Sequence, residues 1–172
     1  MTGSLHHPIG LILAAAFATL APFASGLASA AGLVHLGWSA FLFSILASLA
    51  WIDATSETVP DVLTLALVIT GLAHASAVGA VMLPIAGGAA LLLLAGVLHG
   101  RLTGDLGWIG SGDFFLAAGI VAWFGPVQAL DVLALTTAGL LFHSLIARRA
   151  SIALAPSLAA ASALIWIGGP IL

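Results

Sequence analysis

The chain consists of long apolar stretches separated by short polar connections. The apolar segments cover approximately residues 8–27, 33–53, 59–80, 82–99, 113–125, 127–147 and 151–172. Most approach the roughly 20 residues that a helix needs to cross a bilayer, and none shows the alternation of a membrane strand. The pattern predicts an all-α fold, a polytopic membrane bundle of six or seven transmembrane helices that forms a single domain over residues 1–172.

Two of these segments carry features that affect the helix count. Residues 8–27 end in small residues, as a cleavable signal peptide does, but His6 and His7 rather than Lys or Arg precede them. We therefore expect a retained additional N-terminal helix, with a signal peptide as the alternative. The fifth segment is short, and we expect Gly125 and Pro126 to end it or to form a tight turn.

Composition supports a membrane location and excludes several classes of function. Hydrophobic residues make up 62% of the chain and charged residues only 5%, against roughly 25% in soluble proteins. The absence of cysteine excludes disulfides, thiolate zinc sites and a cysteine nucleophile. The six histidines form no HExxH motif, and the net charge of −3 indicates no nucleic-acid partner. We expect a lipid environment and neither a metal nor another cofactor.

The two most polar connections, residues 54–60 and 100–112, fall on the same side of the membrane if the chain crosses it seven times. Arg101 lies in the second connection, and Arg148 and Arg149 follow the sixth segment on that side. Because basic residues favour the cytoplasmic face, this side is predicted to be cytoplasmic. Removal of the first segment would not change that orientation.

Two carboxylates lie at the ends of apolar segments near the predicted cytoplasmic face. Asp53 ends the second segment, and Asp113 opens the fifth. Ionisable groups at such positions cost several kcal/mol, which favours a functional role. Either residue taken alone is better explained as a solvated helix end.

The sequences around both residues carry a resemblance to a known family. Asp113 ends the motif Gly110-Ser111-Gly112-Asp113, and Asp53 precedes Val59-Pro60-Asp61 and then Leu63-Thr64. This combination resembles the type IV prepilin peptidase family, which belongs to the GxGD membrane aspartic proteases. The resemblance covers roughly residues 40–170. It implies that the catalytic pair is Asp53 and Asp113, with motif-supporting or substrate-binding roles for Gly110, Gly112, Pro60 and Asp61.

Further positions agree with or depart from the family pattern. Residues 152–158, IALAPSL, resemble the apolar, proline-containing start of the family's last helix, although Ala153 replaces its first proline. Phe115 stands where family members commonly have Lys. Larger members carry a cysteine-containing insert and an N-methylation activity, for which this chain has neither cysteines nor room. It looks like the short, peptidase-only kind associated with tight-adherence or Flp-type pili.

The resemblance implies an aspartic endopeptidase that cleaves the leader peptide of prepilin-like proteins on the cytoplasmic side of a bacterial inner membrane. Such hydrolysis needs one ionised and one protonated carboxylate. Asp113 is predicted at a helix N-terminus and Asp53 at a helix C-terminus. The helix dipoles then favour Asp113 as the base and Asp53 as the acid.

Other interpretations of these residues stay open. Gly110 and Gly112 would allow a sharp turn or a close approach of substrate, or they are ordinary loop glycines. Pro60 suits the first turn of a helix, and we expect Asp61 and Glu57 to cap that helix rather than bind substrate. At the level of the whole protein, the alternatives are a carboxylate-using transporter and an inactive scaffold. No inverted second half supports transport.

Overall fold

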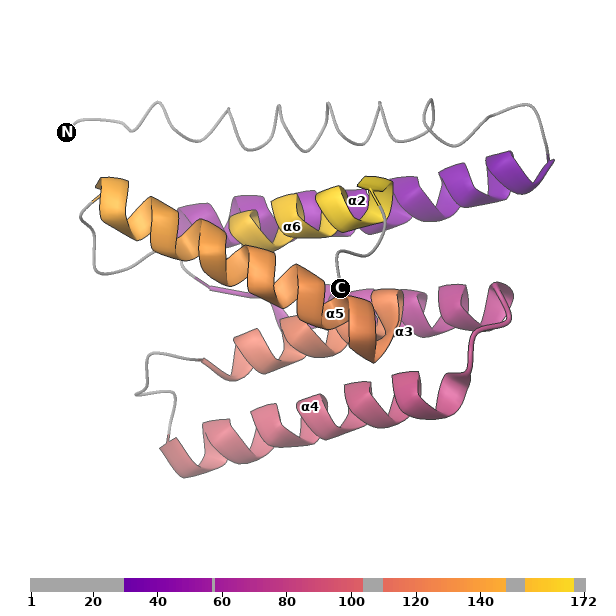
Figure 1. Cartoon of the computed structure of the whole chain (residues 1–172). Coiled ribbons are helices and arrows are strands. Elements are labelled where there is room, and N and C mark those ends of the chain that lie inside the picture. Colours follow the sequence, from indigo (N-terminus) through magenta and orange to yellow (C-terminus); the bar gives the residue numbers. More distant parts are fainter. Residues whose placement is uncertain (1–29, 57, 104–109, 148–153, 169–172) are drawn as a thin grey trace. The chain divides into compact units, whose positions relative to one another are not determined.

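The structure of the chain, a computed structural model, describes residues 30–56, 58–103, 110–147 and 154–168. These residues form only helices and no strands: α2 (Ala30–Ser56), α3 (Asp61–Ala77), α4 (Met82–Thr103), α5 (Ser111–Ala147) and α6 (Leu154–Gly168) (Figure 1). The prediction of an all-α fold is confirmed for this part of the chain. The expected first helix, residues 8–27, lies outside it.

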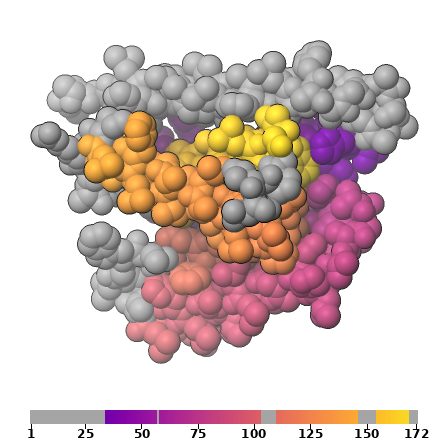
Figure 2. Space-filling model, in the orientation of Figure 1, coloured from indigo at the N-terminus to yellow at the C-terminus, as the bar shows by residue number. Residues whose placement is uncertain are grey.

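Within the described part of the chain, three helical stretches are long and apolar enough to cross a membrane: Val34–Ser56, Met82–Leu102 and Ser111–Leu145. Helices α3 and α6 are apolar but shorter. Helix α4 presents many large apolar side chains outward, with Leu83 and Leu102 each 84% exposed. Its side chains form one outer surface of the part of the chain that contains it (Figure 2). In water such a surface would be unfavourable, whereas lipid chains solvate it.

Helix α3 ends through a backbone motif that glycine makes possible. The Ala80 N–H donates to the Ala75 carbonyl at 2.9 Å, and the Gly79 N–H donates to Ser76 at 3.2 Å. Gly79 has a φ of 71°, which residues with a Cβ rarely adopt. The helix therefore stops at Ala77, before the end of the predicted segment at residue 80. Helix α4, in contrast, continues beyond residue 99 to Thr103.

Helix α5 contains the break that glycine and proline predicted. Gly125 has φ 75° and ψ 167°, outside the helical region, and Pro126 follows it. The helix axis changes direction sharply at this point (Figure 1). Pro126 is accommodated because it begins the second part, where a backbone N–H would have no helical partner. The expected boundary between segments 113–125 and 127–147 is confirmed.

The chain forms two compact units, and each brings together segments that are distant in sequence. Of the described residues, the first unit contains 30–56, 135–147 and 154–168, and thus α2, α6 and the last part of α5. The second unit contains 58–103 and 110–134, and thus α3, α4 and the first part of α5.

In the first unit, α2 packs against α6. Leu42, Leu46 and Leu49 recur at helical spacing on α2, and each is at most 2% exposed. Near the start of α2, the indole Nε1 of Trp166 on α6 donates a hydrogen bond to the Ser39 hydroxyl at 2.9 Å. The same indole stacks on His35, with ring centroids 5.1 Å apart and planes 4° from parallel. Apolar packing and a part-buried polar contact thus join the two helices near the start of α2.

In the second unit, α3 and α5 interlock through glycines. A Cβ at Gly119 would lie 2.5 Å from the Leu67 side chain, and one at Gly71 would lie 2.7 Å from the indole of Trp123. The space above Gly71 lets Trp123 reach α3, where its Nε1 donates to the Leu67 carbonyl at 2.9 Å. Each helix thus contributes one large residue and one glycine. Because Leu67 meets Gly119 and Gly71 meets Trp123, the two helices run in the same direction here.

We predict that Gly71→Ala destabilises the protein, because the new Cβ would lie 2.8 Å from the backbone carbonyl carbon of Ala122. Overpacking of this kind costs about 1–3 kcal/mol. The matched control is Gly87→Ala, also within a helix, where no atom lies within 4 Å of the added Cβ. Thermal unfolding in detergent should show a lower midpoint for Gly71→Ala and no loss for Gly87→Ala. Equal midpoints would contradict the close packing of α3 on α5.

Candidate active site

The GxGD motif forms the start of helix α5 in the second unit. The Gly110 N–H donates to Oδ2 of Asp113 at 2.9 Å, and the Asp113 N–H donates to the Gly110 carbonyl at 3.1 Å. This reciprocal pair closes the first helical turn, in the manner of the acidic residue of a capping box. The carboxylate of Asp113 thus lies at the positive end of the helix dipole, which favours a negative charge.

The Val59-Pro60-Asp61 element lies beside this turn. A Cβ on Gly112 would be 3.2 Å from the Cβ of Val59, so the two segments approach closely at Gly112. At Gly110 the nearest such atom is 4.0 Å away, which leaves that position open. Two motif elements about 50 residues apart in sequence are therefore neighbours in one unit. Close approach explains the glycine at 112, and the reciprocal turn explains the position of Gly110.

Pro60 is the N-cap residue of helix α3 and directly precedes its first residue, Asp61. Its φ of −69° and ψ of 125° are extended, and its carbonyl accepts the Leu63 and Thr64 N–H groups at 3.1 and 3.2 Å. The structural role expected for Pro60 agrees with this geometry. The expectation that Asp61 caps the helix is wrong, because the N-cap position is Pro60 and no side chain makes a capping hydrogen bond there. Asp61 is instead exposed in the first turn, where its charge suits the helix dipole. Glu57, the other expected capping residue, lies outside the described residues.

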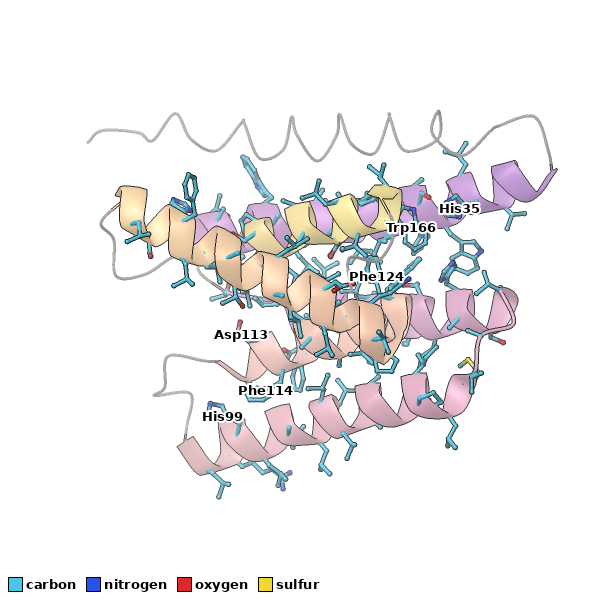
Figure 3. All side chains as sticks on the ribbon, viewed as in Figure 1. His35, His99, Asp113, Phe114, Phe124 and Trp166 are labelled. Carbon is cyan, nitrogen blue, oxygen red and sulfur yellow. The ribbon has the colours of Figure 1, made fainter. Side chains whose placement is uncertain are left out.

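The residues that follow Asp113 pack against helix α4. A Cβ on Gly96 would lie 2.7 Å from the ring of Phe115, so this glycine provides the space for the ring. Phe114 lies beside His99, with ring centroids 5.3 Å apart, near the Asp113 end of the unit (Figure 3). At position 115, where family members commonly carry a cation, this chain has an apolar ring seated on α4.

Asp53 lies in the first unit, near the end of α2. It is 6% exposed and continues the buried face that Leu42, Leu46 and Leu49 form. Its Oδ2 accepts a hydrogen bond of 2.8 Å from the N–H of Ala155, in the first turn of α6. The apolar pattern placed Asp53 correctly near a helix end, but gave no indication of this partner 102 residues away.

This partner removes the argument that distinguished an acid from a base. The dipole of α2 disfavours a charge on Asp53, whereas the first turn of α6 favours it. Asp113 likewise accepts a backbone N–H at the start of a helix. Helix dipoles therefore do not assign the acid and base roles to the two residues.

Two further features of the second unit were not anticipated as candidate sites. An open hollow of about 480 Å³ is lined by Val81, Pro84, Ile85 and residues 124–128. It lies about 18 Å along α5 from Asp113, from the helical rise of about 1.5 Å per residue, and so is separate from that carboxylate. Asp131, beyond the break in α5, is 2% exposed. Among the described residues, no group of three His, Asp or Glu is placed to hold a metal ion.

We predict that the stability of Asp113 variants follows their ability to accept the Gly110 N–H. Asp113→Asn retains a side-chain oxygen and should keep the midpoint of unfolding within a few degrees. Asp113→Ala loses the acceptor and should lower stability by about 1 kcal/mol, as expected for the loss of a cap. Thermal unfolding of both variants in detergent tests this. An alanine variant as stable as wild type would contradict the capping role.

The fold and the candidate site define a helical membrane protein with carboxylates held at the first turns of two helices. The sequence profile of the type IV leader peptidase family matches residues 40–167, so the chain belongs to this family. This confirms the resemblance found in the sequence.

A curated relative shares part of this region. The chain is 39% identical over 109 residues to a prepilin leader peptidase/N-methyltransferase of Neisseria gonorrhoeae. The match covers 56% of this chain and 37% of the length of that protein. No solved structure matches the chain.

Proposed function

We propose that the chain is a membrane aspartic endopeptidase that cleaves the leader peptide of prepilin-like proteins, with Asp53 and Asp113 as its catalytic pair. Membership of the type IV leader peptidase family over residues 40–167 is the observation that carries this proposal. The turn formed by Gly110 and Asp113 supports it, because it holds a carboxylate at a helix start beside the Val59–Asp61 element.

The proposed chemistry uses a water molecule and no side-chain nucleophile. One carboxylate, ionised, accepts a proton as water attacks the scissile carbonyl carbon, while the other, protonated, donates a proton to the carbonyl oxygen. The first carboxylate then passes the proton it took from water to the leaving amine as the C–N bond breaks, and the second takes a proton back from the geminal diol as the C=O bond re-forms. Two nearby carboxylates suit this task, because each disfavours ionisation of the other. The pair therefore titrates as a unit.

The proposed setting is the cytoplasmic face of a bacterial inner membrane, in a chain that crosses it six or seven times. Arg101 is exposed in the last turn of α4 and precedes the GxGD turn by a short connection. A basic residue at this end of the helices favours the cytoplasmic side. The substrate helix would enter from the bilayer and present its leader junction there. Methylation is not part of the proposal, since the chain lacks the cysteine-containing insert.

The first test is cleavage of a prepilin-like precursor in membranes. We expect wild type to remove the leader, and both Asp53→Asn and Asp113→Asn to lose at least about 1,000-fold in rate, since each removes half of the acid–base pair. Asn keeps an oxygen for the Ala155 or Gly110 amide, so both variants should remain folded. Asp131→Asn changes another buried carboxylate, beyond the break in α5 and outside the proposed pair, so it is the matched control and should retain most activity.

Each outcome of this assay distinguishes among the candidate functions. A fully active Asp53→Asn or Asp113→Asn would refute the assignment of the pair. A wild-type protein that leaves several precursors intact would refute the peptidase and favour the scaffold or the transporter.

A second test asks whether the two carboxylates meet, as the mechanism requires, although they lie in different compact units. The chain contains no cysteine, so engineered pairs can be tested without background. We expect Asp53→Cys with Asp113→Cys to cross-link within one chain under mild oxidation or with a short bis-maleimide. Mass spectrometry of the digested protein identifies the bond.

The matched control pairs Asp53→Cys with Ser76→Cys, an exposed residue at the other end of α3. That pair should remain uncross-linked. Asp61 belongs to the element beside the Asp113 turn, and Ser76 lies about 22 Å further along α3, at a rise of about 1.5 Å per residue. Equal yields from both pairs, or none from the aspartate positions, would contradict a shared site.

A further inference from the structure

We propose that the backbone amide of Ala155 is a positioning group for Asp53, so that the first turn of α6 prepares this carboxylate for catalysis. The inference rests on the proposed function, since it assigns a role to a residue that acts through Asp53. It is carried by the 2.8 Å hydrogen bond from the Ala155 N–H to Oδ2 of Asp53.

The position of Asp53 creates a need for such a donor. The residue lies in the last turns of α2, where unpaired carbonyls give the helix end a partial negative charge. It is also 6% exposed, so little water reaches it. A carboxylate there is opposed by both its own helix and its burial. A donor from another element offsets these costs, and α6 supplies it.

The first turn of α6 is suited to this role by its sequence. Amides in the first turn of a helix have no acceptor within that helix, so the Ala155 N–H is available to a side chain. Pro156 has no N–H and has a fixed φ, which restricts the backbone next to the donor. Ala155 is 2% exposed, so its small side chain fits where the backbone must approach Asp53 closely.

The packing of α6 on α2 fixes the direction of this hydrogen bond. Ala155 contacts Asp53 near the end of α2, and Trp166 contacts Ser39 near its start, so the two helices are antiparallel and joined at both ends. The stack of His35 on Trp166 adds to the second contact (Figure 3). Sliding or rotation of α6 would break both contacts. The bond therefore holds Oδ2 in place and fixes the direction of the second carboxylate oxygen.

The test is a steady-state cleavage assay with a prepilin-like precursor and the full-length protein in detergent or liposomes. Ala155→Pro removes the donor, and we expect kcat to fall about 10- to 100-fold, as for the loss of a hydrogen bond to a charged group, with KM unchanged within about twofold. Two matched variants keep the donor. Ala155→Gly retains the amide, and Leu154→Pro places a proline one residue earlier, at a position that tolerates it.

We expect both controls to retain kcat within about threefold of wild type, as helix-start changes that spare the donor should. Thermal unfolding establishes that Ala155→Pro is folded, so that a lower active fraction is not mistaken for a lower kcat. A folded Ala155→Pro variant with wild-type kcat overturns the inference, even where Asp53→Asn is inert. Equal losses in Ala155→Pro and Leu154→Pro also overturn it, because they indicate a general effect on the helix start.

A second measurement decides the matter if Ala155→Pro does not fold. The Ala155 amide proton of ¹⁵N-labelled protein should shift upfield in Asp53→Ala, which removes the acceptor, and much less in Asp53→Asn. An unchanged resonance in Asp53→Ala overturns the inference. A wild-type protein without cleavage activity overturns the proposed function. The hydrogen bond from Ala155 to Asp53 would then have no catalytic role, even if the amide resonance shifts as expected.

Discussion

A carboxylate inside an apolar bundle must be compensated by hydrogen-bond donors or positive charge, and this chain has few cationic side chains. It contains three arginines, no lysine and no tyrosine. Both proposed catalytic residues instead accept backbone N–H groups from the first turns of helices, Asp113 from Gly110 and Asp53 from Ala155. A helix N-terminus supplies both hydrogen-bond donors and a partial positive charge without a cationic side chain. The positions of the two helix starts therefore matter for Asp53 and Asp113.

The close packing of α3 on α5 serves the same requirement in the second unit. Glycines at 71 and 119 allow Trp123 and Leu67 to interlock, and Gly112 lets the start of α5 approach Val59. In a bilayer, where lipid is as apolar as the side chains, such close contact and interhelical hydrogen bonds replace the hydrophobic effect as the source of association. The resulting register places the Val59–Asp61 element beside the GxGD turn. Packing along the helices thus assembles one half of the candidate site.

The substitution at position 115 separates this chain from the common family pattern without disturbing the local fold. The ring of Phe115 lies against Gly96 of α4, where a lysine would bring a charge into an apolar contact. The GxGD turn before it keeps its reciprocal hydrogen bonds. Membership of the type IV leader peptidase family therefore does not depend on the missing cation.

The sequence alone determined the features that depend on neighbours along the chain. Apolar runs identified each described helix, Gly125 and Pro126 identified the break in α5, and the GxGD and Val-Pro-Asp elements identified the family. Helix ends were less well predicted, because local hydrogen bonds such as those at Gly79 decide them. Only the tertiary structure showed that Asp53 meets the start of α6 and that Trp123 occupies the space above Gly71. Those contacts join residues tens to a hundred positions apart, and which helix faces which is set by side-chain packing rather than by local sequence.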